Sequence, residues 1–236
     1  MKHFLLTVFA LLSISSLRAV DIAPAAYEYS IRYHWGLIDE TAASASVFVQ
    51  CNDGNFFGTL AGRSIDWDGR YFEVTDTLDA YMSPEEGNPL PRQDVRNCIG
   101  WYRKPTVDQL RSGCYDPASP ENYVNTAGQG WLDASESTLR NITTTANLLA
   151  AYYYGQTIDF DALTPGQTLS APCGVDISVS LNYNGTTEWN GRPVRDLTIT
   201  YSGADVPVRC LIDSETGVPL LFSASLIIGE VEMTLV

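Results

Sequence analysis

Histidine is scarce in this chain, and its scarcity excludes the commonest catalytic and metal-binding arrangements. Only His3 and His34 occur in 236 residues, and His3 lies in an N-terminal segment that we expect to be removed. A single remaining histidine argues against sites that combine an imidazole with a nucleophile or that need several imidazole ligands. The C-x-x-C motif is typical of zinc and thioredoxin sites, and the five cysteines form no such motif. The sequence therefore predicts no metal site and no cofactor.

Basic residues and long apolar runs are scarce as well. The chain has 14 Lys and Arg against 28 Asp and Glu, a formal net charge of −14. A field of that sign repels nucleic acid and anionic membranes. Beyond the N-terminus no run approaches the roughly 18 apolar residues of a membrane-spanning helix. We therefore expect no nucleic-acid partner and no transmembrane segment, and the acidity alone leaves a calcium-dependent structural role open.

The N-terminus is typical of a secretory signal. Lys2 precedes the apolar run at residues 4–12, and Ala19 is a small residue of the kind found at cleavage sites. We predict a signal peptide at residues 1–19 and one exported β-rich domain at residues 20–236. All five cysteines remain after cleavage, so disulfides are permitted and at least one thiol is left unpaired.

Most of the remaining chain alternates between apolar and polar residues, which predicts β-strands. The clearest case is Tyr27 to Trp35, where His34 falls on the polar face. We interpret His34 as a surface histidine rather than a catalytic base. Further strands are expected at 42–51, 56–64, 70–78, 177–183, 197–201, 206–212, 222–228 and 231–235.

Turn motifs separate these strands at regular intervals. Asp53-Gly54 and Asn190-Gly191 are typical of two-residue hairpin turns, and we predict another turn at Asn184-Gly185. The spacing indicates an all-β protein, with an antiparallel curved sheet or an open or partly closed β-barrel and one or two short helices.

Residues 81–125 interrupt this pattern with six prolines and two cysteines. Proline at such density excludes long regular elements, so we predict an irregular insertion with one strand at 95–102. Cys98 and Cys114 flank part of this segment and are the preferred disulfide pair.

One segment has helical periodicity instead. Leu148, Leu149, Tyr152 and Tyr153 recur at helical spacing, and we predict a helix that begins near residue 134 and ends at Gly155. A short connector and a turn at residues 164–167 follow. A single helix in a β-rich chain usually packs across the open face of a sheet. The tyrosines at 152–154 either line a ligand pocket there or divide into two core residues and one surface residue.

Clustered carboxylates leave an enzymatic alternative. The acids closest in sequence are Asp66, Asp68, Asp76 and Asp79. Trp67 and Trp101 are of the type that stacks on sugar rings, and paired carboxylates hydrolyse glycosidic bonds when one of them has a raised pKa. A carboxylate-dependent hydrolase acting on a carbohydrate is therefore the alternative function. The segment 66–69 lacks the later glutamate of a calcium loop, which favours a simple turn.

Five segments occur in a characteristic order. They are Tyr33–Ile38 (YHWGLI), Thr75–Tyr81 (TDTLDAY), Leu148–Gly166, Ile212–Leu220 and Ile228–Val231. In order and spacing they resemble the exported bacterial proteins grouped as domain of unknown function 3108. Residues 92–115 depart from that family, because they are rich in Cys and Pro and lack its histidine. The resemblance implies an exported β-rich fold in the periplasm or cell envelope of a Gram-negative bacterium, and it implies no activity.

These observations favour a non-enzymatic cell-envelope protein with a binding or scaffolding role. Its partner would be an apolar ligand, a glycan or another envelope protein. The aromatic residues that we expect to face such a ligand are Tyr33, Trp35, Tyr152 and Tyr153. The bland alternative is that these side chains simply fill the core of the sheet.

Overall fold

The computed structural model describes residues 21–65, 73–83, 92–103, 123–127, 130–131, 148–172, 178–202, 206–226 and 229–236. The N-terminal strands are β1 Ile22–Trp35, β2 Ile38–Asn52, β3 Asn55–Ser64, β4 Glu73–Ser83, β5 Arg92–Arg103, β6 Tyr123–Ala127 and β7 Gly130–Trp131. The C-terminal strands are β8 Thr168–Pro172, β9 Ser178–Trp189, β10 Arg192–Tyr201, β11 Val208–Asp213, β12 Pro219–Leu226 and β13 Gly229–Leu235. The predicted signal peptide at 1–19 lies outside the described residues.

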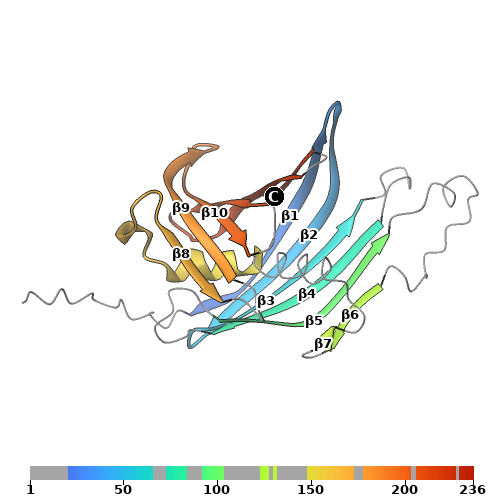
Figure 1. Cartoon of the computed structure of the whole chain (residues 1–236), viewed down its shortest axis with the longest axis horizontal. Coiled ribbons are helices and arrows are strands. Elements are labelled where there is room, and N and C mark those ends of the chain that lie inside the picture. The colour runs from blue at the N-terminus through green and yellow to red at the C-terminus, as the bar shows by residue number, and fades with distance from the viewer. Residues whose placement is uncertain are drawn as a thin grey trace, which may run out of the picture.

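The thirteen described strands form one sheet, in the order β7-β6-β5-β4-β3-β2-β1-β13-β12-β11-β10-β9-β8. Every described pair is antiparallel, and strands that follow one another in the chain lie side by side, except for β7 and β8. The pairing of β1 with β13 joins the two halves of the chain. β7 and β8 stand at opposite ends of this order, so the sheet is open. Figure 1 shows the sheet curling, so that β8, β9 and β10 face β1, β2 and β3. The predicted all-β class and curved antiparallel sheet are confirmed.

A helix at residues 148–157 lies inside the curve of the sheet (Figure 1). From Leu149 to Tyr154 every side chain is at most 3% exposed, so the helix is buried on all sides. Phe56 of β3 packs edge-on against Tyr153 of the helix, and residues of β9 to β13 belong to the same hydrophobic core. The part of the predicted helix before residue 148 lies outside the described residues.

The predicted end of the helix at Gly155 is wrong, because the helix continues through residue 157. Gly155 does not have the left-handed backbone of a helix-ending glycine. A side chain there would overlap the carbonyl oxygen of Gly217, in the turn between β11 and β12. Beside this contact, the Gln156 amide donates a hydrogen bond to the carbonyl oxygen of Thr216. The glycine therefore permits close packing of the helix on a turn.

The second correction concerns Asn184-Gly185, which is not a hairpin turn. β9 runs through both residues to Trp189, and its register with β10 shifts between Asp196 and Leu197. Gly185 has a φ of +119°, which fits a β-bulge and not a chain reversal. The other two turns are confirmed, since Asp53-Gly54 and Asn190-Gly191 both have the two positive φ values of a type I′ turn.

Several strands differ in extent from the sequence prediction. The predicted strand at 95–102 is confirmed and lengthened as β5, inside the segment that was expected to be irregular. The short strand β8 was not predicted. Cys98 lies in β5 opposite Thr126, and Cys114 lies outside the described residues, so their disulfide stays a prediction. Cys51 and Cys210 are buried free thiols. No helix in the described part of the chain has the length and apolar character needed to span a bilayer.

Candidate functional site

The four aromatic residues predicted to face a ligand separate into two groups. Tyr152 and Tyr153 lie on the buried helix, with exposed fractions of 3% and 0%. Tyr33 and Trp35 lie at the far end of β1, where Trp35 is 54% exposed. The alternative division of the tyrosine run into two core residues and one surface residue is wrong, because Tyr154 is buried as well.

The helix tyrosines are bound into the core by rings and hydroxyls. Tyr152 packs against Tyr27 with ring centroids 5.2 Å apart, and Tyr153 meets Phe56 edge-on at 5.9 Å. The Tyr29 hydroxyl donates to the carbonyl oxygen of Pro219 at 2.6 Å, so its bond with the Tyr152 hydroxyl is donated by Tyr152. This chain of bonds ties the helix to β1 and β12.

Burial raises the pKa of all three of these phenols. Desolvation is the largest cause for Tyr29, Tyr152 and Tyr153, and it raises the pKa of Tyr153 to about 12. The phenols therefore stay protonated at neutral pH and are poor candidates for a general base. Their arrangement is that of a packed core.

The other end of β1 continues the same face of the sheet into solvent. Residues two apart in a strand share a face, so Ile31, Tyr33 and Trp35 follow Tyr27 and Tyr29. The exposed fraction is 1% at Tyr29, intermediate at Ile31 and Tyr33, and 54% at Trp35. The helix thus covers one end of this aromatic row and leaves the other open.

Neighbouring strands widen this open end into an apolar surface. Val231 of β13 pairs with Tyr33 on one side and Ala224 of β12 on the other, and Leu226 pairs with Gly229. A side chain at Gly229 would lie 3.1 Å from Trp35 Cβ and 3.2 Å from Tyr33 Cε2, so both residues pack closely over that glycine. We call the surface the inner strip, and it consists of Ile31, Tyr33, Trp35, Ala224, Leu226 and Val231.

The strip ends at the turn that joins β1 to β2. Gly36 has a φ of +59° and Leu37 has no positive φ, which is typical of a type II′ turn. The Trp35–Ile38 pair closes the hairpin, and Leu37 projects from it with an exposed fraction of 105%. Three of the five exposed large hydrophobic residues in the described chain, Trp35, Leu37 and Leu226, therefore gather at one place.

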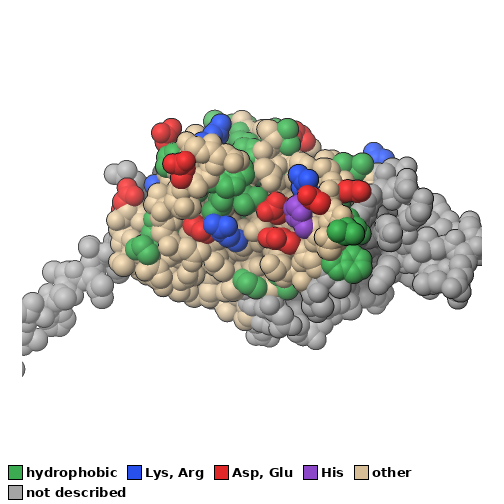
Figure 2. All heavy atoms as spheres, turned by 90° about the horizontal axis from the view of Figure 1, so that it is seen from above, with side chains coloured by type: hydrophobic (Ala, Val, Ile, Leu, Met, Phe, Trp, Pro, Cys, Tyr) green, Lys and Arg blue, Asp and Glu red, His purple; other side chains and the backbone are tan. Residues whose placement is uncertain are grey.

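Charged side chains surround this hairpin end on the outer face. Asp39 accepts a hydrogen bond from Arg32 Nε at 2.6 Å and lies 2.9 Å from His34 Nδ1. Glu232 lies 3.4 Å from His34 Nε2. Figure 2 shows the histidine among acidic side chains, with hydrophobic side chains close by. The predicted surface position of His34 is confirmed, since its side chain is 34% exposed.

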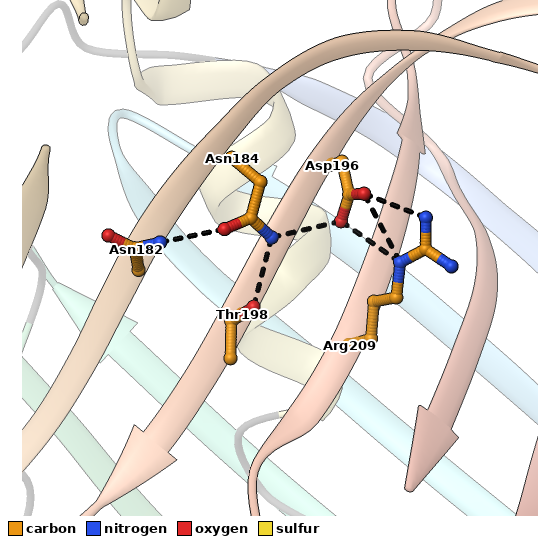
Figure 3. A network of polar contacts seen from close by, with 5 residues as sticks. All are labelled: Asn182, Asn184, Asp196, Thr198 and Arg209. Atoms are coloured by element: carbon orange, nitrogen blue, oxygen red, sulfur yellow. Dashed lines mark hydrogen bonds and ion pairs between the residues drawn. The ribbon is translucent and has the colours of Figure 1, made fainter. Parts of the chain in front are cut away.

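A second polar network lies on the outer face of β9, β10 and β11. In Figure 3, Arg209 donates to both carboxylate oxygens of Asp196, and Asn184 donates to Asp196 and Thr198 at 3.1 and 2.9 Å. Asn182 donates in turn to Asn184 at 2.7 Å. The side chains satisfy one another across three strands, so the network holds the bulged strand β9 in register with its neighbours.

The acids proposed for hydrolysis are not brought together by any described contact. Asp66 and Asp68 lie outside the described residues, and Asp76 and Asp79 occupy β4 opposite Gly62 and Thr59. A different carboxylate, Asp213, is buried, and it accepts two backbone bonds from Glu215 and Thr216 at 2.9 and 2.8 Å. Burial opposes its ionisation, but these bonds outweigh burial and hold its pKa below 3.8. A general acid needs the opposite shift.

In the described residues, fold and surface together define a class of protein: an open antiparallel sheet that curls around a helix and has an apolar hairpin end. No family model matches the chain. No curated protein matches it either. Among solved structures, it is similar to the crystal structure of a beta-barrel-like protein of domain of unknown function DUF1849 from Brucella abortus. The identity is 10%, the TM-score is 0.35, and the match covers 92% of this chain and 98% of that chain.

Sequence reasoning found Tyr33 and Trp35 but missed the residues around them. Leu37 was noted only within the segment Tyr33–Ile38, and Leu226 only within the strand expected at 222–228. The signal in the sequence was Trp-Gly-Leu-Ile, because a glycine at the first position of a two-residue hairpin turn places the next residue at the tip of the hairpin. The contribution of β12 and β13 required the pairing of β1 with β13, which no local pattern contains.

Proposed function

We propose that this protein is a non-enzymatic, exported binding or scaffolding protein of the cell envelope, and that the inner strip is its binding surface. The observation that carries the proposal is the exposure along one face of β1, from 1% at Tyr29 to 54% at Trp35. An aromatic row that a fold needs only for packing ends where the core ends, whereas this one continues past the helix. Clustered exposed apolar residues are typical of binding surfaces.

The proposed location rests on the sequence. The N-terminal segment favours export, and the resemblance to domain of unknown function 3108 favours the periplasm or envelope of a Gram-negative bacterium. Both are inferences that fractionation of the producing cells and N-terminal sequencing of the mature chain test directly. A mature chain that retains residues 1–19 would contradict export through this signal.

An apolar dye tests the binding surface without knowledge of the ligand. We expect the folded chain to enhance the fluorescence of anilinonaphthalene sulfonate, and the double variant Trp35→Ser, Leu226→Ser to lose most of this enhancement. Val236→Ser is the matched control, because Val236 is 88% exposed and lies outside the strip. A folded wild-type chain that gives no enhancement would remove the inner strip as a binding surface.

Native mass spectrometry then identifies the ligand class. The protein from its producing cells is measured before and after organic extraction, and an extractable mass identifies a lipid or another apolar molecule. A mass that survives extraction and contains hexose identifies a glycan. If the chain instead releases sugars from a polysaccharide, and does so through its carboxylates, the alternative hydrolase function replaces the one proposed here.

A further inference from the structure

The hairpin between β1 and β2 carries a second feature that a surface for small apolar ligands does not need. Leu37 lies in the two-residue turn, outside the inner strip, and its side chain is fully exposed. Position two of a type II′ turn tolerates almost any residue, and a polar residue there would avoid exposing apolar area. A leucine at this position therefore has no role in folding that the structure shows.

Carboxylates line the hairpin end on both faces. Asp39 and Glu230 pair with His34 in the two ladders, and Glu232 pairs with Arg32. Glu40 pairs with Tyr33 on the inner face. In the described strands around the turn, four carboxylates thus stand against one guanidinium and one imidazole. We call these four carboxylates the acidic rim, and they consist of Asp39, Glu40, Glu230 and Glu232.

We propose that the hairpin end, with Trp35, Leu37 and Leu226 at its centre and the acidic rim around them, docks into an apolar socket rimmed by Lys and Arg on another protein of the envelope. The inference rests on the proposed function and gives it a partner. A buried apolar centre with a polar rim is the usual anatomy of a protein interface, and Trp is enriched among residues that dominate binding energy. Charge complementarity selects the sign of the socket.

The same charges argue against the other occupants. A second copy of this chain would bring two acidic rims together, and like charges across an interface suppress association. An anionic bilayer would repel the rim and the whole chain, whose formal net charge is −14. A socket with positive charges is attracted over a range that salt shortens, so the association is expected to slow as ionic strength rises.

A photocrosslinker at the turn is the direct test. Benzoylphenylalanine replaces Leu37 in the producing cells, where its full exposure makes the change harmless to the fold. We expect a covalent adduct with one protein, and the purified pair then supplies the decisive measurement. Leu37→Ser and Glu230→Lys are each expected to weaken the dissociation constant by about tenfold or more. Val236→Ser is expected to leave it within about twofold, as for a residue outside the interface.

Each other outcome overturns the inference. These outcomes are the absence of an adduct, an adduct with the chain itself, and a partner whose affinity neither variant changes. Cosedimentation with phosphatidylcholine vesicles that Leu37→Ser abolishes would assign the hairpin end to a membrane surface instead. Failure of the proposed function is distinguishable, because the dye reads the inner strip. Dye binding without an adduct removes only the docking partner, whereas absence of dye binding removes the strip itself.

Discussion

The middle of strand β1 and its C-terminal end have the same alternating sequence pattern and opposite surroundings. In the middle of the strand Tyr29 is buried, and its hydroxyl is bonded to Tyr152 of the helix and to Pro219. At the C-terminal end Trp35 is 54% exposed, over Gly229 and beside the turn at Gly36 and Leu37. Alternation of apolar and polar residues thus defines which side chains share a face of the sheet, but not whether that face is buried. The position of the helix determines which part of the face becomes core.

The largest expected effect comes from disturbing the close contact between the helix and the turn that joins β11 to β12. Gly155→Ala places a methyl group against the Gly217 carbonyl oxygen and 2.9 Å from its carbon, where backbone must move. We expect a loss of about 3 kcal/mol or more in the free energy of unfolding, measured by urea denaturation. Gly62→Ala is the matched control, since nothing lies within 3.8 Å of its new methyl group. Equal losses for the two variants would contradict a close helix–turn contact.

The next largest expected effect is a loss of stability at alkaline pH, caused by the three buried phenols beneath and on the helix. The folded chain holds the phenolic protons of Tyr29, Tyr152 and Tyr153 more tightly than the unfolded chain does. The contribution of these phenols to the free energy of unfolding is therefore fully present below the ordinary pKa of 10.0. It falls as the pH rises above that value, by roughly 1.4 kcal/mol per pH unit for each phenol. Thermal melting between pH 8 and 11 checks this. A melting temperature that does not fall over this range would contradict the tighter hold of the folded chain on these protons.

Two neighbouring tyrosines separate the role of the hydroxyl from that of the ring. Tyr152→Phe removes the donor to Tyr29 and is expected to cost about 1 kcal/mol in urea unfolding. Tyr153→Phe removes a buried hydroxyl that has no hydrogen-bond partner in the described structure, and it is expected to be neutral or stabilising. The rings and their packing are retained in both variants. A larger loss of stability in Tyr153→Phe than in Tyr152→Phe would indicate that the Tyr153 hydroxyl has a hydrogen-bond partner after all.

Much of the region where the helix covers β1 could be predicted from the sequence, whereas the exposed hairpin end could be predicted only in part. Alternation located β1, and helical spacing located the segment 148–157, since both depend on local patterns. Gly155 was misread because a helix-ending glycine and a glycine at a close contact look alike in sequence. The same holds for Gly185, where a positive φ serves a bulge. Strand order is a non-local property, so the meeting of Trp35 with Leu226 was beyond the sequence pattern.

The smallest expected effect on stability is at Leu37, in the turn between β1 and β2. A small effect there separates a role in binding from a role in folding. Leu37→Ser exposes no new surface and breaks no contact, because the side chain is already fully exposed, so unfolding should change by less than about 0.5 kcal/mol. Leu149→Ala is the counterpart, since its side chain is completely buried and its loss should cost about 2–5 kcal/mol. Urea denaturation of both variants checks the contrast. An exposed leucine that contributes nothing to folding adds apolar surface, so a neutral Leu37→Ser variant favours a role in binding. A substantial loss of stability at residue 37 would instead make Leu37 part of the core and remove the docking inference.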